Sequence, residues 1–136
     1  MTLQSAISAV QAIVGAISGI RKAPDYPPEQ LNVFPFAVAY SGGGNWTFGP
    51  AGDKRGLHNI VVEIHIQRKD LPRDVSTAMG YSDSIPNNLM KSPTLSGTCD
   101  TFAGISYTFG ALNYGETQTL GFRFTITGVK IQSVIT

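Results

Sequence analysis

A regular alternation of side chains through His58–Lys69 constrains the fold more than any other stretch of the chain. Ile60, Val62, Ile64 and Ile66 fall on one parity, and Asn59, Val61, Glu63, His65 and Gln67 fall on the other. Successive side chains of a β-strand point to opposite faces, so the pattern predicts a long strand with one face on a core. The β-branched residues on that parity suit a pleated surface. We expect Glu63 and His65 on the outer, polar face.

The composition indicates one domain with few charges. With 136 residues the chain is long enough to bury a core without metals or disulfides, and we expect a single domain over residues 1–136. Only 14% of its residues are charged and its net charge is +1, whereas a typical soluble domain is about 25% charged. We therefore expect partners to cover much of the surface. Lys54–Arg55 and Arg68–Lys69 are short basic steps that we interpret as solvated, because phosphate binding needs clustered cations.

The N-terminal segment, residues 1–22, is expected to form a helix over Thr2–Ile20. Its apolar residues repeat at helical spacing, namely Leu3, Ile7, Val10, Val14 and Ile17. A secretory signal would need an early positive charge and a cleavage site, and a membrane span is disfavoured by Gln4, Gln11 and the serines. We expect a helix packed on the sheet. The small residues on its back, including Gly15 and Gly19, would let a neighbouring subunit approach closely.

The stretch Ser41–Leu57 contains six glycines and is the strongest local indication of a partner. It follows a Pro-rich connector over Arg21–Gln30 and a strand predicted for Leu31–Tyr40. Long loops are usually functional or disordered, and Trp and Arg are residue types that anchor interfaces. The candidate interaction residues are therefore Trp46, Phe48, Lys54 and Arg55, together with Gly15 and Gly19 of the helix. The alternative is a long β-hairpin whose Trp46 folds back onto its own sheet.

The second half of the chain is expected to hold short helices and a second hairpin. Asp70 and Ser84 are candidate N-caps for two short helices, or for one broken helix, and Gly80 would end the first. Strands are predicted over Phe102–Phe109 and Thr117–Thr127, with a turn over Ala111–Glu116. Past Gly128 the apolar parity flips to Val129 and Ile131, which indicates a β-bulge. Residues 128–136 would then extend this strand or form an arm onto a neighbour.

This order of elements predicts an α+β fold. We expect a mostly antiparallel, twisted sheet of about four to five strands, with an N-terminal helix and one or two short helices packed on it.

Residues with catalytic potential are few. Glu63 and His65 lie two residues apart on one strand, and His58 precedes them, but a metal or catalytic site needs a third partner. The single Cys99 allows neither a disulfide nor a thiolate cage, and we interpret it as a small hydrophobe. There is no P-loop, HExxH motif or GxSxG elbow. We expect no enzymatic activity, cofactor or metal.

Several stretches spread over most of the chain carry a resemblance to a known family. They are the uncharged amphipathic helix, FPFAVAY at 34–40, the Gly-rich stretch, RGLHNIVVEIHIQRKDLPRDV at 55–75, DSIPNNLM at 83–90 and GFRFTITGVKI at 121–131. Together they resemble the tail terminator, or tail completion, proteins of long-tailed bacteriophages.

The resemblance implies a structural protein of the virion. Copies would form a hexameric ring that caps the tail tube at its head-proximal end, stops its polymerisation and joins it to the neck. The implied partners are other copies of the chain, the tail tube protein and a head-neck stopper or adaptor protein. DNA would pass through the ring without sequence-specific contacts, and assembly would take place in the host cytoplasm without a membrane. The alternatives are a stopper or adaptor, a tube subunit, or a small metal-dependent enzyme using Glu63 and His65.

Overall fold

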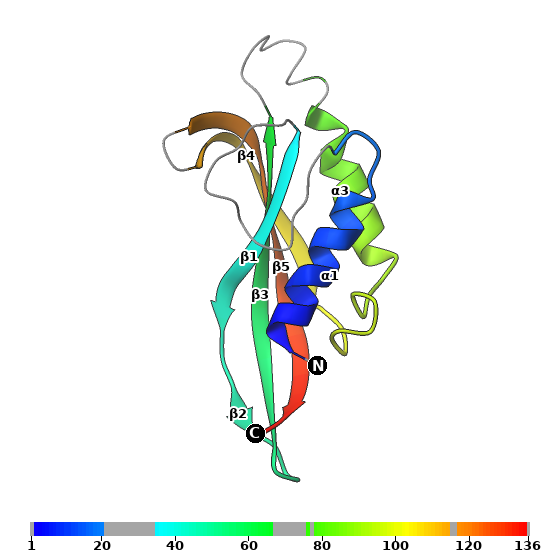
Figure 1. Cartoon of the computed structure of the whole chain (residues 1–136), viewed down its shortest axis with the longest axis vertical. Coiled ribbons are helices and arrows are strands. Elements are labelled where there is room, and N and C mark those ends of the chain that lie inside the picture. Colours follow the sequence, from blue (N-terminus) through cyan, green and yellow to red (C-terminus); the bar gives the residue numbers. More distant parts are fainter. Residues whose placement is uncertain (1, 21–34, 67–75, 77, 115–116, 136) are drawn as a thin grey trace.

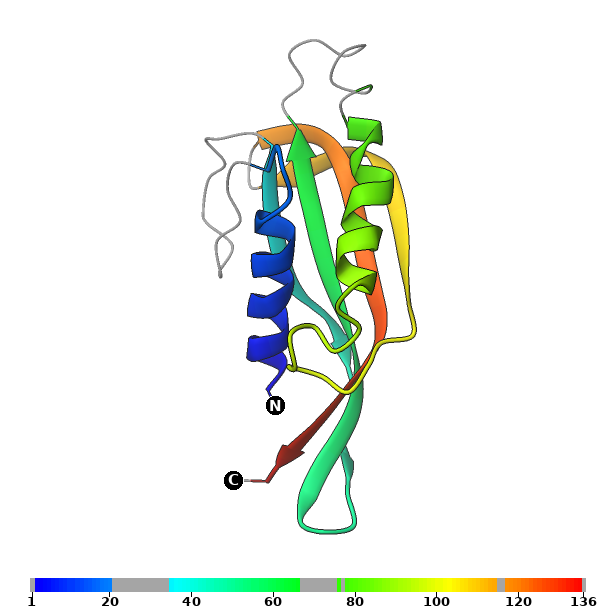
Figure 2. The ribbon, with the colours of Figure 1, turned by 90° about the vertical axis from the view of Figure 1, so that its right-hand side faces the viewer.

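The structure, a computed structural model, describes residues 2–20, 35–66, 76, 78–114 and 117–135. In chain order its elements are α1 (Leu3–Gly15), β1 (Phe36–Gly44), β2 (Thr47–Phe48), β3 (Asp53–Ile66), α3 (Tyr81–Met90), β4 (Gly104–Tyr114) and β5 (Thr117–Val134). The strands form an antiparallel sheet in the order β1-β3-β5-β4, and β2 pairs with β3 beside that path. Both helices cover the same face of the sheet (Figures 1 and 2). The predicted α+β architecture is confirmed.

The core lies between the two helices and the sheet. In the centre, Ile64 of β3 pairs with Ala37 of β1 and Phe122 of β5, and these three side chains lie on the side of the sheet that faces the helices. The helices contribute their own apolar stripes, and the core cluster includes Val10, Val14, Ile85, Leu89, Ile60, Val62, Phe124 and Ile126. The apolar parity predicted for His58–Lys69 is therefore the helix-facing side of β3. Residues 67–69 of that predicted strand lie outside the described residues.

The edge strand β4 completes an aromatic cluster with β5. Phe109 lies beside Phe122 with ring centroids 4.7 Å apart, and Phe122 stacks on Phe124 at 5.4 Å. Such offset pairs add to the free energy gained from burial alone. The two β5 rings are fully buried, whereas Phe109 and Tyr107 remain partly exposed at the edge.

The N-terminal helix is shorter than its periodicity predicts. Thr2 is its N-cap, with its hydroxyl accepting a hydrogen bond from the backbone N–H of Ser5 at 3.1 Å. The helix ends at Gly15, and residues 16–20 form turns rather than the continuous helix to Ile20 that we expected. Gly19 has a φ of +95°, a left-handed conformation that glycine adopts without strain. The chain therefore leaves the helix one turn early.

Three other expected boundaries are corrected by the structure. The predicted long loop Ser41–Leu57 is largely a β-hairpin, since β1 runs to Gly44, β2 pairs with β3, and β3 begins at Asp53. The second short helix starts at Tyr81, with Gly80 as N-cap, so Ser84 lies inside it. The predicted turn Ala111–Glu116 is strand as far as Tyr114. In the hairpin, backbone pairing extends past the residue that the local sequence signals as a boundary. In α3, the helical hydrogen bonds do the same.

The predicted parity flip in the last strand is confirmed as a bulge. Ile126 pairs with Ile60 and Val129 pairs with His58, so two residues of β5 lie opposite Asn59 alone. Gly128 occupies the bulge with a φ of +66°. The bulge returns Val129 and Ile131 to the helix-facing core, and both are fully buried. Beyond it the chain extends the strand to Val134.

Gly121 is expected to be essential to the sheet. It lies in β5 opposite His65, and a Cβ atom there would overlap the carbonyl oxygen of Ile64 in β3. Gly121→Ala should lower the free energy of unfolding by about 3 kcal/mol, since backbone in a central strand cannot yield easily. Guanidinium denaturation measures this. Gly104→Ala is the matched control, because a Cβ there meets only Thr127 Oγ1 at 3.9 Å; equal losses in both variants would contradict the prediction.

Candidate interaction surface

The sheet extends beyond the helices as a narrow ribbon of strands. The first residues of β3 pair on one side with β2 and on the other with the last residues of β5, from Asp53↔Val134 to His58↔Val129. This ribbon lies past the N-terminal end of α1, and the end of the described chain lies beside it (Figures 1 and 2). We call the segments 45–58 and 130–135 the ribbon end. Its inner end, at His58 and Ile131, is buried, and in the described part of the chain no helix covers the remainder.

Backbone and side-chain hydrogen bonds hold the hairpin of the ribbon end together. The N–H of Asn45 donates to the carbonyl of Leu57 at 3.1 Å, and the Asn45 side-chain oxygen accepts from the Leu57 N–H at 3.3 Å. At the turn, the N–H of Gly49 donates to the carbonyl of Asp53 at 2.7 Å. Gly52 has a φ of +72°, which the tight return of the chain requires. The glycines thus shape a defined hairpin.

Trp46 packs on the helix-facing side of this hairpin. Its ring centroid lies 4.4 Å from that of His58, and the Lys54 ammonium lies 4.5 Å from the centre of the Trp46 ring. The ammonium is attracted to the negative face of the indole, an interaction that holds two neighbouring side chains together. The alternative in which Trp46 folds back onto its own sheet is the one that the structure shows. Trp46 nevertheless stays partly exposed.

Large apolar side chains gather at the ribbon end. Five of the nine exposed large hydrophobic residues among the described residues belong to it, namely Trp46, Phe48, Leu57, Val134 and Ile135. Phe48 is 92% exposed, although its type is usually buried. Trp46, Thr47, Phe48, Lys54 and Ile135 line an open, largely apolar cavity of about 230 Å³. Clustered exposure of this kind marks surfaces that bind other molecules.

The opposite side of the ribbon carries polar and charged residues beside the apolar Leu57 and Val134. Gln132 donates to the Asp53 carboxylate, and Arg55 Nε lies 3.4 Å from the same carboxylate oxygen. A groove of about 460 Å³ on this end is lined by Asn45, Thr47, Arg55, Gly56, Leu57 and Lys130. Because successive residues of β3 point to opposite sides, Lys54 lies at the apolar cavity and Arg55 lies in the groove on the other side.

The structure brings four of the six candidate interaction residues together. Trp46, Phe48 and Lys54 share one cavity, and Arg55 lies on the other side of the same hairpin. Gly15 and Gly19 are separate from them, at the end of α1 and in the turns after it. A Cβ at Gly19 would lie 2.8 Å from the hydroxyl of Tyr81, so this glycine allows a close approach within the chain. Gly15 is exposed.

Sequence reasoning did not single out Leu57, Val134 or Ile135 as surface residues. Their apolar character predicts core positions, and only the pairing of β3 with β5 beyond the helices exposes them. The available signal was the end of the apolar alternation at Ile131, after which the polar Gln132 and Ser133 follow.

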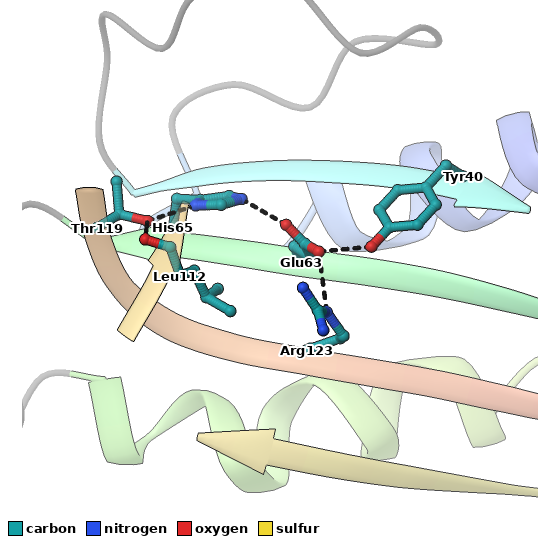
Figure 3. A network of polar contacts seen from close by, with 6 residues as sticks. All are labelled: Tyr40, Glu63, His65, Leu112, Thr119 and Arg123. Atoms are coloured by element: carbon teal, nitrogen blue, oxygen red, sulfur yellow. Dashed lines mark hydrogen bonds and ion pairs between the residues drawn. The ribbon is translucent and has the colours of Figure 1, made fainter. Parts of the chain in front are cut away.

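The expectation that Glu63 and His65 face solvent is wrong. Both are buried, because the side of the sheet that faces away from the helices is also covered at this end. Figure 3 shows that side chains from neighbouring strands point toward the Glu63 carboxylate. One oxygen accepts from Tyr40 and, at 3.0 Å, from Arg123 Nε, while the other lies 2.9 Å from His65 Nε2. His65 Nδ1 in turn lies 2.6 Å from the Thr119 hydroxyl.

This network keeps Glu63 ionised. Burial alone would raise the pKa of its carboxyl, but hydrogen bonds from His65, Tyr40 and Arg123 outweigh burial and hold the pKa at about 2. Burial and the bond to Glu63 raise the pKa of Tyr40 to about 12. Since the carboxylate can only accept, His65 Nε2 donates to it. Every member of the network has a partner, which is the condition for stabilising a buried polar group.

The order Thr119–His65–Glu63 matches a hydroxyl, a base and an orienting acid, but its atoms are not accessible. His65 is 0% and Thr119 is 1% exposed, so a substrate cannot reach the hydroxyl in this conformation. Cys99 is likewise buried, and burial, aided by the charge of Asp100, raises the pKa of its thiol to about 11. A catalytic thiolate needs the opposite shift.

Neither a metal centre nor a membrane-spanning helix is found among the described residues. Within those ranges, no three His, Cys, Asp or Glu side chains are grouped so that they could hold an ion. No helix there has the length and apolar character needed to cross a bilayer. Compared with known proteins, the chain matches no protein-family model and no curated sequence.

The Glu63 network is expected to stabilise the fold in a pH-dependent way. Because the carboxyl pKa falls from 4.5 unfolded to about 2 folded, its contribution of about 3 kcal/mol is complete above pH 4.5 and lost as the pH falls toward 2. Glu63→Gln should lower the free energy of unfolding at pH 7 by about 3 kcal/mol and flatten this acid dependence. Urea denaturation at several pH values tests it.

Asp83→Asn provides the matched control for Glu63→Gln. Asp83 is an exposed acid in the first turn of α3, and losing its interaction with the helix dipole should change stability by less than about 1 kcal/mol. If the two acid-to-amide changes had equal effects, the network would contribute nothing beyond an ordinary surface charge.

Proposed function

We propose that this protein is a structural component of a bacteriophage tail, a terminator that forms a ring, caps the tail tube and joins it to the head neck. The observation that carries the proposal is the ribbon end: a hairpin that extends past the helix layer with Phe48 92% exposed at its side. A surface of this shape suits contact with another protein. The ring and its stoichiometry come from the resemblance in sequence described above.

The exposure of both faces of the ribbon supports a role in assembly. A narrow strand ribbon is only marginally stable in water unless a further layer packs on it. Here one face carries Trp46, Phe48 and Ile135, and the other carries Leu57 and Val134. A chain that keeps this much apolar surface beyond its core is suited to bury it against a partner.

The edges of the sheet support a closed ring of identical subunits. The path β1-β3-β5-β4 has an even number of antiparallel strands, so its two edge strands, β1 and β4, run in opposite directions. Subunits arranged about an axis parallel to the strands would therefore place unlike edges next to each other in antiparallel orientation. Such head-to-tail contacts give a ring when the rotation closes. In the described part of the chain the outer edges of β1 and β4 have no strand partner, and a neighbouring subunit would satisfy their backbone groups.

In this proposal the ribbon end makes the axial contact with the tail tube. One ring face reproduces the interface between successive rings of the tube, and the other face, which binds the stopper or adaptor of the neck, does not propagate it. DNA passes through the ring, and the protein acts in the virion after assembly in the host cytoplasm. No catalytic step is required of any residue.

The particle formed by the purified protein tests the proposal. Size measurement by light scattering and symmetry from averaged electron micrographs should give rings or monomers that form rings on a tube end. Unlimited tubes would identify a tube subunit instead, and binding to the head connector without binding to tubes would identify a stopper or adaptor. A monomer that binds neither component would contradict the proposal.

Phe48→Ser is expected to separate assembly from folding. Phe48 is almost fully exposed, so the free energy of unfolding should change by no more than about 0.5 kcal/mol. Loss of its apolar contact should leave tube ends uncapped, giving tails of abnormal length and unattached heads in negative-stain images. Met79→Ser is the control, because Met79 is an exposed apolar residue before α3, away from the ribbon end. Normal virions with Phe48→Ser would remove the ribbon end from the mechanism.

A further inference from the structure

His58 occupies an unusual position inside the ribbon end. It lies at the junction of three strands, paired with Gly44 of β1 and Val129 of β5, and only 3% of it is exposed. The Trp46 ring covers it with a centroid distance of 4.4 Å. Among the residues that the structure describes, its buried Nε2 atom has no hydrogen-bond partner. A histidine that is buried without a partner at this atom is suited to the neutral imidazole and not to the cation.

Two glycines leave the space that the imidazole fills. A Cβ at Gly44 would overlap the Nδ1 atom of His58, and a Cβ at Gly56 would lie 2.8 Å from its Nε2 atom. The ring is thus enclosed by strand backbone at both nitrogens and by the indole of Trp46. Within the described ranges, no carboxylate acts on the ring to compensate a positive charge.

The charges around His58 act against protonation. Burial lowers the pKa of His58 below its ordinary 6.5, and the positive charge of Lys54 on the same side of β3 lowers it further. The facing segment of β1, residues 41–44, is uncharged, and so is the whole of α1. On β5 the residue opposite is Val129, and the neighbouring Lys130 pairs with Leu57 on the other side of the ribbon.

We propose that His58 makes the ribbon end pH-sensitive: the neutral imidazole packs beneath Trp46, and its protonation drives the ring into water and opens the hairpin. The opened hairpin exposes His58, which then binds a proton at its ordinary pKa of about 6.5. The closed hairpin binds that proton only at a lower pH. Acidification therefore favours the open form, by linkage, between these two pH values.

The opening would regulate the proposed contact surface. Trp46 forms part of the cavity that holds Phe48, Lys54 and Ile135, so displacing its ring dismantles that cavity. The pH-dependent opening is a property of the chain alone. Its consequence, weaker binding at the ribbon end in acid, rests on the proposed function.

Fluorescence of the full-length protein tests the switch directly. Trp46 is the only tryptophan, so its emission reports on this hairpin. Titration from pH 8 to pH 4 should shift the emission toward that of solvated indole, with a midpoint below 6.5. His58→Asn should abolish the transition, with far-UV circular dichroism at pH 7.5 verifying its fold. Proton NMR of the His58 imidazole in the wild-type protein gives the midpoint of its protonation independently of any variant.

Two lysine variants distinguish a titrating imidazole from general acid unfolding. Lys54→Gln removes the cation that opposes protonation, so the midpoint should move upward, toward 6.5. Lys130→Gln removes a cation on the other side of the ribbon and should leave the midpoint unchanged. A His58 imidazole that titrates at 6.5 or above, or a fluorescence transition that persists in His58→Asn, would overturn the proposal.

Binding to tube ends, measured at pH 7.5 and pH 5, separates this inference from the proposed function. If the Trp46 emission shifts with pH as expected but the protein binds no tube at either pH, the switch stands and the proposed function fails. If the protein caps tubes and the Trp46 emission does not shift with pH, the function stands and the switch fails.

Discussion

The double pairing of β3 is the constraint on which the rest of the structure depends. This strand bonds to β1 or β2 on one edge and to β5 along its whole length on the other. From Ile60 to Ile66 both of its faces are buried, one under the helices and one within the Glu63 network. A strand in that position has neither edge nor face free, so its register fixes the register of its neighbours. The ribbon end is the continuation of the same strand beyond the layer that buries it.

The helix-facing half of this arrangement follows from the sequence. Alternation over residues 58–66 and 120–126 identifies the core side of two strands, and the flip after Gly128 locates the bulge, because each signal is local. The burial of Glu63 and His65 does not follow in the same way. Their partners Tyr40, Thr119 and Arg123 are 23 to 60 residues away in the chain. A polar residue on a strand is normally assigned to solvent, and only tertiary pairing shows that these polar groups satisfy one another.

The residues of the ribbon end also divide into those that the sequence indicates and those that it does not. Trp46, Phe48, Lys54 and Arg55 stand out in the sequence because aromatic and basic residues among glycines are unusual, and the structure places them on one hairpin. Their distribution over two sides of the ribbon depends on strand pairing, which the glycines obscure. The contribution of Val134 and Ile135 depends on the path of β5, which returns the end of the chain to the hairpin formed some 80 residues earlier. Local composition contains no information about that return.

The continuity of β3 has a mechanical consequence. Its 14 residues span about 45 Å without a break, from the exposed hairpin to the buried carboxylate network. A rigid rod of this kind transmits a sideways load from its free tip to its clamped base. The bulge at Gly128 in the adjoining strand is the one irregularity in the β3–β5 ladder, at Asn59, next to the first residues of the ribbon end. Bending is therefore concentrated at Asn59, and a load applied to the tip exerts a torque on the core.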